Sequence, residues 1–322
     1  MYVVTGSPLA DRMLCRVKAF LQSCELDWDE SVTFTAVLMD DDEIVATASL
    51  DGGTIKCVAV SPAHQGEDLT ARILTEVFQE AARRGKEHLL LYTKPKNSHL
   101  FAPLGFHPVV RTPGCLLMEN RRGGLAKFLE GIEKPQGQPV GCVVANCDPF
   151  TMGHRRLIEA AAGDCAWVHV FILSEDRGMF TAAQRLAMAR EGLFDLPNVL
   201  VHPTGPYMVS SSTFPTYFIK DKAQAGQIHC EVDVRLFGEK IAPALSITRR
   251  YVGTEPVCAV TAQYNRTMKA LLPEYGIEVI EMDRYAVCGE VVSASRIRSL
   301  IREKRMDALA GLLPASTLMH LR

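Results

Sequence analysis

The sequence contains no apolar run of about 18 residues, so none of its segments is expected to cross a membrane as a helix. Near its start, Asp11 and Arg12 interrupt the stretch where a secretory signal would need apolar residues. Its ten cysteines include no Cys-x-x-Cys pair, which disfavours a zinc site or a disulfide framework. Lysine and arginine total 35 and aspartate and glutamate total 37, so no broad cationic field attracts nucleic acid. These absences favour a cytoplasmic protein that binds neither membranes nor nucleic acids.

The composition that remains is that of an ordinary globular protein, with 48% apolar and 22% charged residues. A length of 322 residues corresponds to about two domains. The segment EKPQGQP at 133–139 holds two prolines and one glycine, which is typical of a linker. We therefore expect a first domain at 1–132, a linker at 133–139 and a second domain at 140–322.

The first domain has the pattern of a small α/β domain. Residues 32–60 alternate in hydropathy as three successive strands do, with a turn at Asp51, Gly52 and Gly53. A helical pattern follows from Thr70 and ends at Gly85, and residues 89–92 form another strand pattern.

The second domain alternates between buried strands and helices. Continuous apolar runs at 140–145 and 167–173 are typical of strands covered on both faces. Further strands are expected at 198–202, 249–253 and 277–282, with helical patterns between them, including one at 215–226. This alternation predicts a doubly wound parallel sheet, whose ligands bind beyond the carboxyl ends of its strands.

A candidate phosphate site follows the first strand of that sheet. Asn146 lies in the loop after the strand, and Thr151, Gly153 and His154 open the next helix. The first turn of a helix presents unpaired N–H groups and the positive end of its dipole, which suit a phosphate. Gly153 leaves room for a phosphate against the backbone, and His154 can donate a hydrogen bond to an oxygen that gains charge.

A second candidate helix start lies far downstream, in VVSASRIRSLI at 291–301. Ser293 and Ser295 would place hydroxyl and N–H groups on phosphate oxygens. Arg296 or Arg298 would add a guanidinium that can bind phosphate through two hydrogen bonds. Either helix start alone is commonly only a capped helix, so the prediction depends on both serving one ligand.

These two segments resemble the HxGH nucleotidyltransferase superfamily, whose members bind ATP and allow attack at its α-phosphate. The segment CDPFTMGH is similar to that superfamily's first motif, with Thr151 where many members have a first histidine. The segment VVSASRIR is similar to its ISSTxIR motif, and this match favours Arg298 over Arg296. The resemblance implies that Asn146, Gly153, Ser293, Ser295 and Arg298 bind ATP phosphates, with His154 and Thr151 in the catalytic role.

Longer segments, among them STFPTYFIK and RRYVGTEP, resemble the citrate lyase ligase family along nearly the whole chain. The resemblance implies an ATP-dependent ligase that acetylates the thiol of a dephospho-coenzyme-A-type group on the acyl carrier subunit of citrate lyase. Acetyl-AMP would form on the way, with AMP and pyrophosphate released and Mg²⁺ held mainly by ATP. Two alternatives stay open: an adenylyltransferase of the nicotinamide mononucleotide or phosphopantetheine type, and a carrier-binding scaffold with degenerate motifs.

Three further residues are weaker candidates for binding ATP. The superfamily often has a phosphate-binding or substrate-binding arginine near the position of Arg185. Lys220 is cationic, and Glu255 follows a strand end where adenine or ribose could lie. An ordinary solvated position is the alternative for Arg185 and Lys220.

The first domain resembles the GNAT acetyltransferase superfamily in two places. The segment SPAHQGEDLTARIL is similar to its pyrophosphate-binding loop, and PLGF at 103–106 to a later element. Gln65 and Gly66 match a variant of the loop, whereas Asp68 stands where a second glycine is expected. The resemblance implies either that this domain holds the coenzyme-A-like arm of the carrier or that it is a vestigial docking domain.

Overall fold

The chain forms two compact units, which we describe separately in a computed structural model. The model describes residues 1–210, 214–256, 258–287 and 289–321. The first unit comprises Met1–Leu125 together with 211–232, and the second comprises Ala126–Ser210 and Asp233–Arg322. The expected linker at 133–139 has no helix or strand, and the domain boundaries stay a prediction. Within the described ranges, no helix is both long and apolar enough to cross a bilayer.

The first unit is built on a seven-stranded sheet of order β1-β2-β3-β4-β5-β7-β6. Helix α2 packs its apolar side, with Ile73 and Val77, on this sheet. The three strands expected between residues 32 and 60 are β2, β3 and β4, and the expected helix is α2. The elements are β1 (Tyr2–Gly6), α1 (Asp11–Ser23), β2 (Phe34–Asp40), β3 (Glu43–Asp51), β4 (Thr54–Val60), α2 (Leu69–Arg83), β5 (Leu90–Thr93), α3 (Ser98–Phe101), β6 (His107–Arg111) and β7 (Leu116–Glu119).

A segment from the second half of the chain completes the first unit. Phe214 lies edge-on to Tyr92 of β5 at 5.4 Å between ring centroids, and the Tyr217 carbonyl accepts the Asp27 N–H at 2.9 Å. The helix predicted at 215–226 is wrong in its first part, because α7 begins only at Lys222. The reason is that the aromatic side chains of 214–219 are buried in this unit, and burial there outweighs local helix propensity.

The second unit contains a five-stranded, fully parallel sheet of order β10-β9-β8-β11-β12. The predicted doubly wound α/β fold is thus confirmed, and the strand order reverses between β8 and β11. Its elements are α4 (Gly124–Glu130, which begins in the first unit), β8 (Val140–Ala145), α5 (Met152–Asp164), β9 (Trp167–Ile172), α6 (Ala182–Gly192), β10 (Val199–Pro203), α7 (Lys222–Leu236, which also begins in the first unit), α8 (Ala242–Ala244), β11 (Arg249–Gly253), α9 (Ala259–Leu271), β12 (Glu278–Met282), β13 (Ala286–Val287), β14 (Glu290–Val291), α10 (Ala294–Arg302) and α11 (Ala315–Met319).

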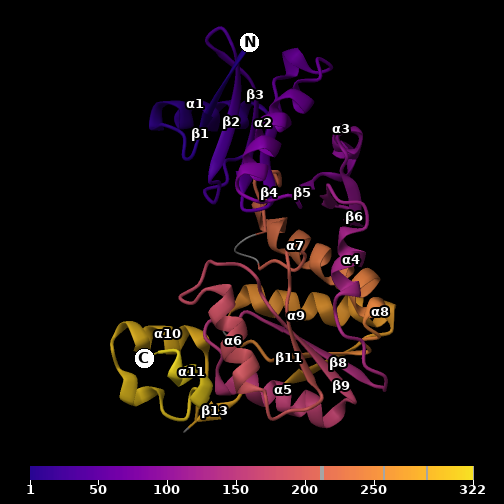
Figure 1. Cartoon of the computed structure of the whole chain (residues 1–322), viewed down its shortest axis with the longest axis vertical. Coiled ribbons are helices and arrows are strands. Elements are labelled where there is room, and N and C mark those ends of the chain that lie inside the picture. Colours follow the sequence, from indigo (N-terminus) through magenta and orange to yellow (C-terminus); the bar gives the residue numbers. More distant parts are fainter. Residues whose placement is uncertain (211–213, 257, 288, 322) are drawn as a thin grey trace. The chain divides into compact units, whose positions relative to one another are not determined.

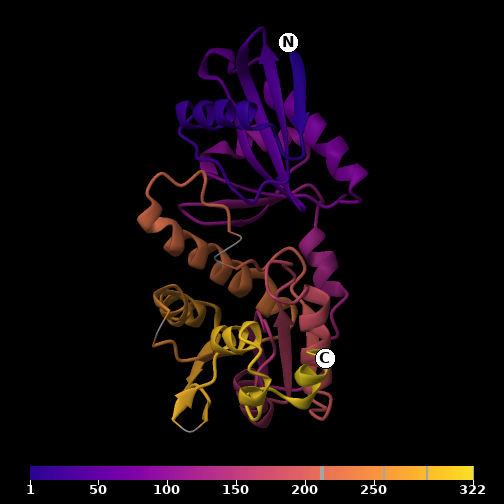
Figure 2. The same cartoon turned by 90° about the vertical axis from the view of Figure 1, so that its left-hand side faces the viewer.

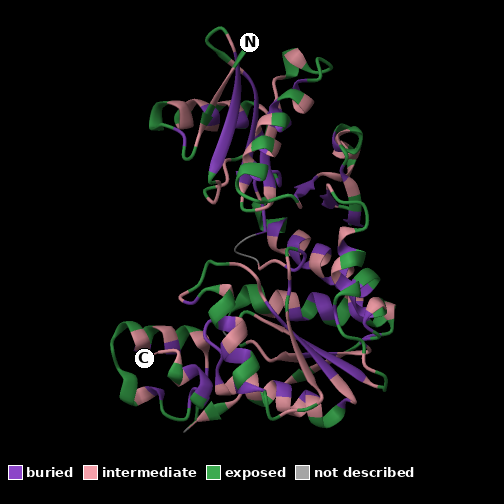
Figure 3. Ribbon diagram, viewed as in Figure 1, coloured by how far each residue is buried: buried purple, intermediate pink, exposed green. Residues whose placement is uncertain are grey.

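Helices cover both faces of this sheet. Figure 1 shows α5 and α9 on opposite sides of the strands, and Figure 3 shows β8 and β9 largely buried. Ile158 of α5 and Met188 of α6 pack on Val143 and Val170 in one core. Since both faces are covered, the carboxyl ends of the strands are where polar loops can meet.

Two histidines on the opposite face of the sheet predict a pH dependence of folding. His169 Nδ1 on β9 lies 3.1 Å from His202 Nε2 on β10, and burial lowers the pKa of both rings to about 4. The unfolded chain takes up these protons near pH 6.5, whereas the folded chain does not. Stability is therefore full above pH 6.5 and falls as the pH drops toward 4, by at most about 1.4 kcal/mol per pH unit for each histidine.

Urea unfolding at pH 7.5, 6.0 and 5.0 measures this effect. Replacing Trp28 by phenylalanine leaves Trp167 of β9 as the fluorescent reporter of the second unit. His169→Phe should weaken the pH dependence without abolishing it, because His202 remains, whereas His99→Ala, at an exposed site, should leave it unchanged. A free energy of unfolding that does not change between pH 7.5 and 5.0 would contradict the lowered pKa values. It would mean that both rings take up protons as readily in the folded chain as in the unfolded chain.

Candidate active site

A tight loop carries the chain from β8 into α5, at the point where the strand order reverses. Cys147 adopts a left-handed backbone with φ of +53°, and Phe150 is fully buried. Thr151 is the N-cap of α5, and its Oγ1 accepts the His154 N–H at 3.3 Å. In return, His154 Nδ1 accepts the Thr151 N–H at 3.1 Å, which completes a capping box.

This capping box sets which nitrogen of His154 carries the proton. Because Nδ1 accepts a backbone N–H, the neutral ring carries its proton on Nε2. Burial, and secondarily the charge of Arg284, lower the pKa of His154 to about 4. His154 is therefore a neutral hydrogen-bond donor through Nε2–H at pH 7, in the first turn of a helix, where backbone N–H groups lack partners within the helix.

The starts of α5 and α10 lie side by side. A Cβ atom added to Gly153 would lie 3.4 Å from the carbonyl oxygen of Val292, the residue before the α10 N-cap Ser293. Arg298 Nη1 donates to the Asp148 carbonyl oxygen at 2.5 Å, which ties α10 to the loop before α5. Figures 1 and 2 show α10 and α11 together beside α6. The two predicted helix starts are thus brought together.

The start of α10 is itself regular. Ser293 Oγ accepts the Arg296 N–H at 3.3 Å and lies 3.2 Å from Ser295 Oγ, whose side chain is exposed. The Arg296 guanidinium forms an ion pair with Glu290. Arg298 rather than Arg296 therefore faces the loop before α5, as the motif match favours.

Arg185 is placed differently from the expectation of a phosphate-binding residue. Its side chain is fully buried, and Nη1 donates to the Asn146 carbonyl at 2.7 Å and to Asn146 Oδ1 at 2.5 Å. Nε donates to the Phe180 carbonyl at 3.3 Å, and Nη2 to the Glu175 carbonyl. Arg185 thus holds the loop after β8 in place and orients the amide of the exposed Asn146 through its oxygen.

Glu255 and Lys220 are also occupied within the protein. The Glu255 carboxylate is 5% exposed, pairs with Arg284 and accepts the Cys258 N–H at 3.0 Å. Lys220 belongs to the first unit, where its Nζ pairs with Glu25 at 2.5 Å. Neither side chain is among the groups that meet at the α5 and α10 starts.

The loop with Gln65 and Gly66 lies directly before α2 in the first unit. Both residues are on its surface, and Gly66 has a φ of +95° that favours glycine. Asp68 precedes α2 with a left-handed φ of +53° and forms no side-chain cap. The loop is accessible, but Asp68 places a carboxylate side chain at the helix start.

Asp148 and Arg284 lie at the candidate site, and the sequence did not single them out. The Asp148 carboxylate is buried and accepts the N–H groups of Met179 and Phe180 at 3.0 and 2.9 Å. A Cβ atom on Gly178 would lie 2.5 Å from that carboxylate, so the loop before α6 closes tightly over it. The feature of the sequence that could have identified Arg284 is its position just after the end of a strand, β12.

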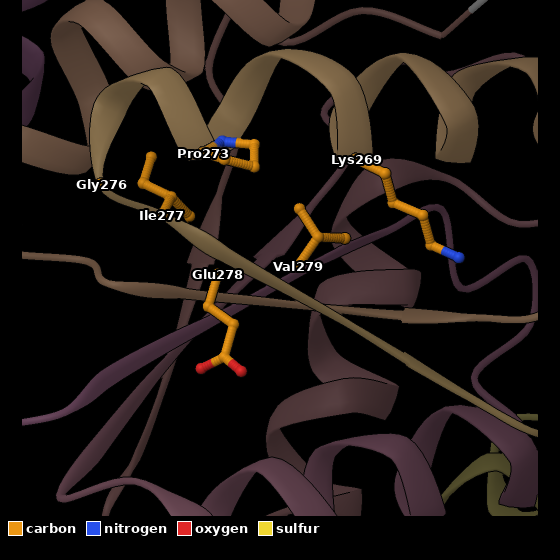
Figure 4. Close-up of a pocket in the computed structure, with 6 residues that line it drawn as sticks. All are labelled: Lys269, Pro273, Gly276, Ile277, Glu278 and Val279. Carbon is orange, nitrogen blue, oxygen red and sulfur yellow. The ribbon is translucent and has the colours of Figure 1, made fainter.

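In the described ranges, no group of three or more His, Cys, Asp or Glu side chains is placed to hold a metal ion. A pocket shown in Figure 4 lies away from the helix starts, since it opens at the amino end of β12. It is lined by Lys269, Pro273, Gly276, Ile277, Glu278 and Val279. The carboxyl ends of the parallel strands remain the candidate site, because the donor groups gather there.

Comparison with known proteins matches both halves of the chain. A family model described as the citrate lyase ligase C-terminal domain matches residues 140–321, and the acetyltransferase (GNAT) family model matches 10–106. Citrate (pro-3S)-lyase ligase of Klebsiella pneumoniae is 37% identical over 95% of this chain and 91% of its own length. The Escherichia coli K12 protein of the same name is 37% identical over 97% and 91%. Phosphopantetheine adenylyltransferase of Dehalococcoides mccartyi is 38% identical over 20% of this chain and 41% of its own length.

Proposed function

Because the chain belongs to the citrate lyase ligase family, we propose that it is a ligase that acts on citrate lyase, by acetylating the prosthetic thiol of its acyl carrier subunit. The observation that carries the chemistry is the meeting of two helix starts around the neutral Nε2–H of His154. That arrangement supports binding of one triphosphate, and therefore ATP as a substrate.

In the first step, a carboxylate oxygen of acetate attacks the α-phosphorus of ATP. The bond from that phosphorus to the bridging oxygen breaks, pyrophosphate leaves and acetyl-AMP forms. Little covalent chemistry falls to the protein, whose groups position the phosphates and stabilise charge on their oxygens. His154 Nε2–H and the N–H group of Gly153 are assigned to the α-phosphate side, and Ser293, Ser295 and Arg298 to the outer phosphates.

In the second step, the carrier thiolate attacks the acetyl carbonyl carbon of acetyl-AMP. The carbon–oxygen bond to the phosphate breaks, AMP leaves and a thioester remains on the carrier. Mg²⁺ enters this scheme with ATP, held by phosphate oxygens, since the buried Asp148 carboxylate is already occupied by two N–H groups.

The first unit is proposed to hold the coenzyme-A-like arm of the carrier at the surface loop with Gln65 and Gly66. The family's GNAT-type half supports this assignment, and a docking role without arm binding is the alternative. Deleting residues 1–130 would not test it cleanly, because Phe214 and Tyr217 are buried in this unit and would lose their packing.

Exchange of labelled pyrophosphate into ATP, measured with the purified full chain, separates the candidate functions. Acetate-dependent exchange supports the ligase. Incorporation of AMP into nicotinamide mononucleotide or phosphopantetheine, without any response to acetate, would instead favour an adenylyltransferase, the class to which the partial match in Dehalococcoides belongs. ATP binding with no turnover in either assay would favour the scaffold.

A further inference from the structure

A second arginine lies at the same edge of the sheet, held in a fixed orientation. Arg284 follows β12, and its Nε donates to the Thr254 carbonyl, just beyond β11, at 2.7 Å. Its Nη2 pairs with the buried carboxylate of Glu255. Nη1 has no hydrogen-bond partner among the described residues. Two nitrogens of the guanidinium are therefore fixed by the protein, and the third is left to bind something else.

The segment that begins with Arg284 runs along the first turns of α5. The guanidinium of Arg156 on α5 lies 5.7 Å from the ring centroid of Tyr285. The Val292 N–H donates to the Tyr285 carbonyl at 2.9 Å, and Val292 adjoins Gly153 as described above. These contacts place Arg284 beside the α5 start, where its charge acts on His154.

We propose that Arg284 binds the phosphates of ATP through Nη1 beside His154, and that Glu255 is the positioning residue that orients it. This assignment rests on the proposed function, because it takes ATP as the ligand of the site. Glu255, which was expected to touch adenine or ribose, acts instead through Arg284. A guanidinium fits this role because its rigid fork can bind the Glu255 carboxylate on one side and a phosphate oxygen on the other.

The contrast with the other arginines supports this choice. All three guanidinium nitrogens of Arg185 donate to protein carbonyl or amide oxygens. Arg296 pairs with Glu290 on the surface, where a salt bridge adds little to stability. Unlike Arg185 and Arg296, Arg284 combines a buried carboxylate partner, a place at two strand ends and an uncommitted nitrogen.

The test uses the full chain and the variants Arg284→Ala, Arg284→Lys and Glu255→Gln. In acetate-dependent exchange, Arg284→Ala should raise the KM for ATP about tenfold or more, as loss of a charge-assisted hydrogen bond does. The KM for acetate should not change. Arg284→Lys should recover part of the loss, and Glu255→Gln should raise the KM for ATP severalfold with a smaller effect on kcat. Arg302→Ala, at the exposed end of α10, serves as the control.

Direct binding of Mg–ATP, measured by equilibrium dialysis, separates this inference from the proposed function. If the wild-type chain binds ATP without acetate-dependent exchange, the function is wrong, and a weaker affinity of Arg284→Ala still supports the role of Arg284. An unchanged ATP affinity in Arg284→Ala, with wild-type circular dichroism, would overturn it and would mean that Arg284 only holds the loops after β11 and β12 together. A wild-type chain that binds no ATP would overturn both.

Discussion

His154→Ala is expected to lower the rate of acetate-dependent pyrophosphate exchange by about 10²-fold or more. The variant removes a donor that is already oriented: Nδ1 is held by the Thr151 N–H, and Nε2–H projects from the first turn of α5. Such a donor needs no reorganisation as charge develops on a phosphate oxygen. The effect should fall on kcat, because the hydrogen bond strengthens as the transition state forms.

Thr151→Val and His320→Ala are the matched comparisons for this variant. Thr151→Val removes the hydroxyl next to Nδ1 but keeps the backbone N–H that orients the ring, so its loss should be smaller. His320 pairs with Glu191 at the surface, and its replacement should leave exchange near the wild-type rate. The neutral state of His154 predicts no loss of exchange from this ring between pH 8 and 6, since its pKa is about 4. A near-normal rate in His154→Ala would remove the residue from the chemistry.

Arg185→Ala is expected to destabilise the second unit by about 3 kcal/mol or more, since each buried acceptor left without its donor costs about 1–3 kcal/mol. The change leaves the carbonyls of Asn146, Phe180 and Glu175 without their donor and opens a cavity under the loop after β8. Exchange activity should fall as well, because Asn146 loses the contact that fixes its amide.

Urea unfolding with Trp167 as the reporter measures this loss of stability. Arg190→Ala is the control, since Arg190 lies on the same helix, is exposed and donates only to the Val201 carbonyl. Its replacement should change the free energy of unfolding by no more than about 0.5 kcal/mol. If the two variants were equally stable, the buried hydrogen bonds of Arg185 would not be what stabilises the loop after β8.

The sequence alone predicts those parts of this site that depend on residues close together in the chain. The start of α5 could be predicted because Thr151 and His154 have the spacing of a capped helix after a buried strand. The start of α10 could be predicted for a similar reason, from Ser293. The strand-and-helix alternation sufficed for the parallel sheet, because each buried run is local.

The same reasoning could not predict contacts between residues that are far apart in the sequence. Arg185 was a candidate either for binding ATP or for a solvated position, and nothing in its own helix indicates that three carbonyls from two loops surround it. Glu255 and Arg284 are 29 residues apart, and only the parallel pairing of β11 and β12 brings them together. The segment at 215–221 was predicted to be helical, but its aromatic side chains are buried in the first unit instead. Burial in the tertiary structure determines the conformation and contacts of such residues. A single sequence does not show which side chains will be buried together.

Backbone hydrogen exchange of the full chain, with and without Mg–ATP, tests most directly whether one triphosphate lies between the two helix starts. The account predicts slower exchange in peptides that cover 151–156 and in those that cover 293–298, at the same ATP concentration. Peptides covering 276–279, at the amino end of β12, should not change. Slowing at only one of the two helix starts, or at neither, would contradict the account.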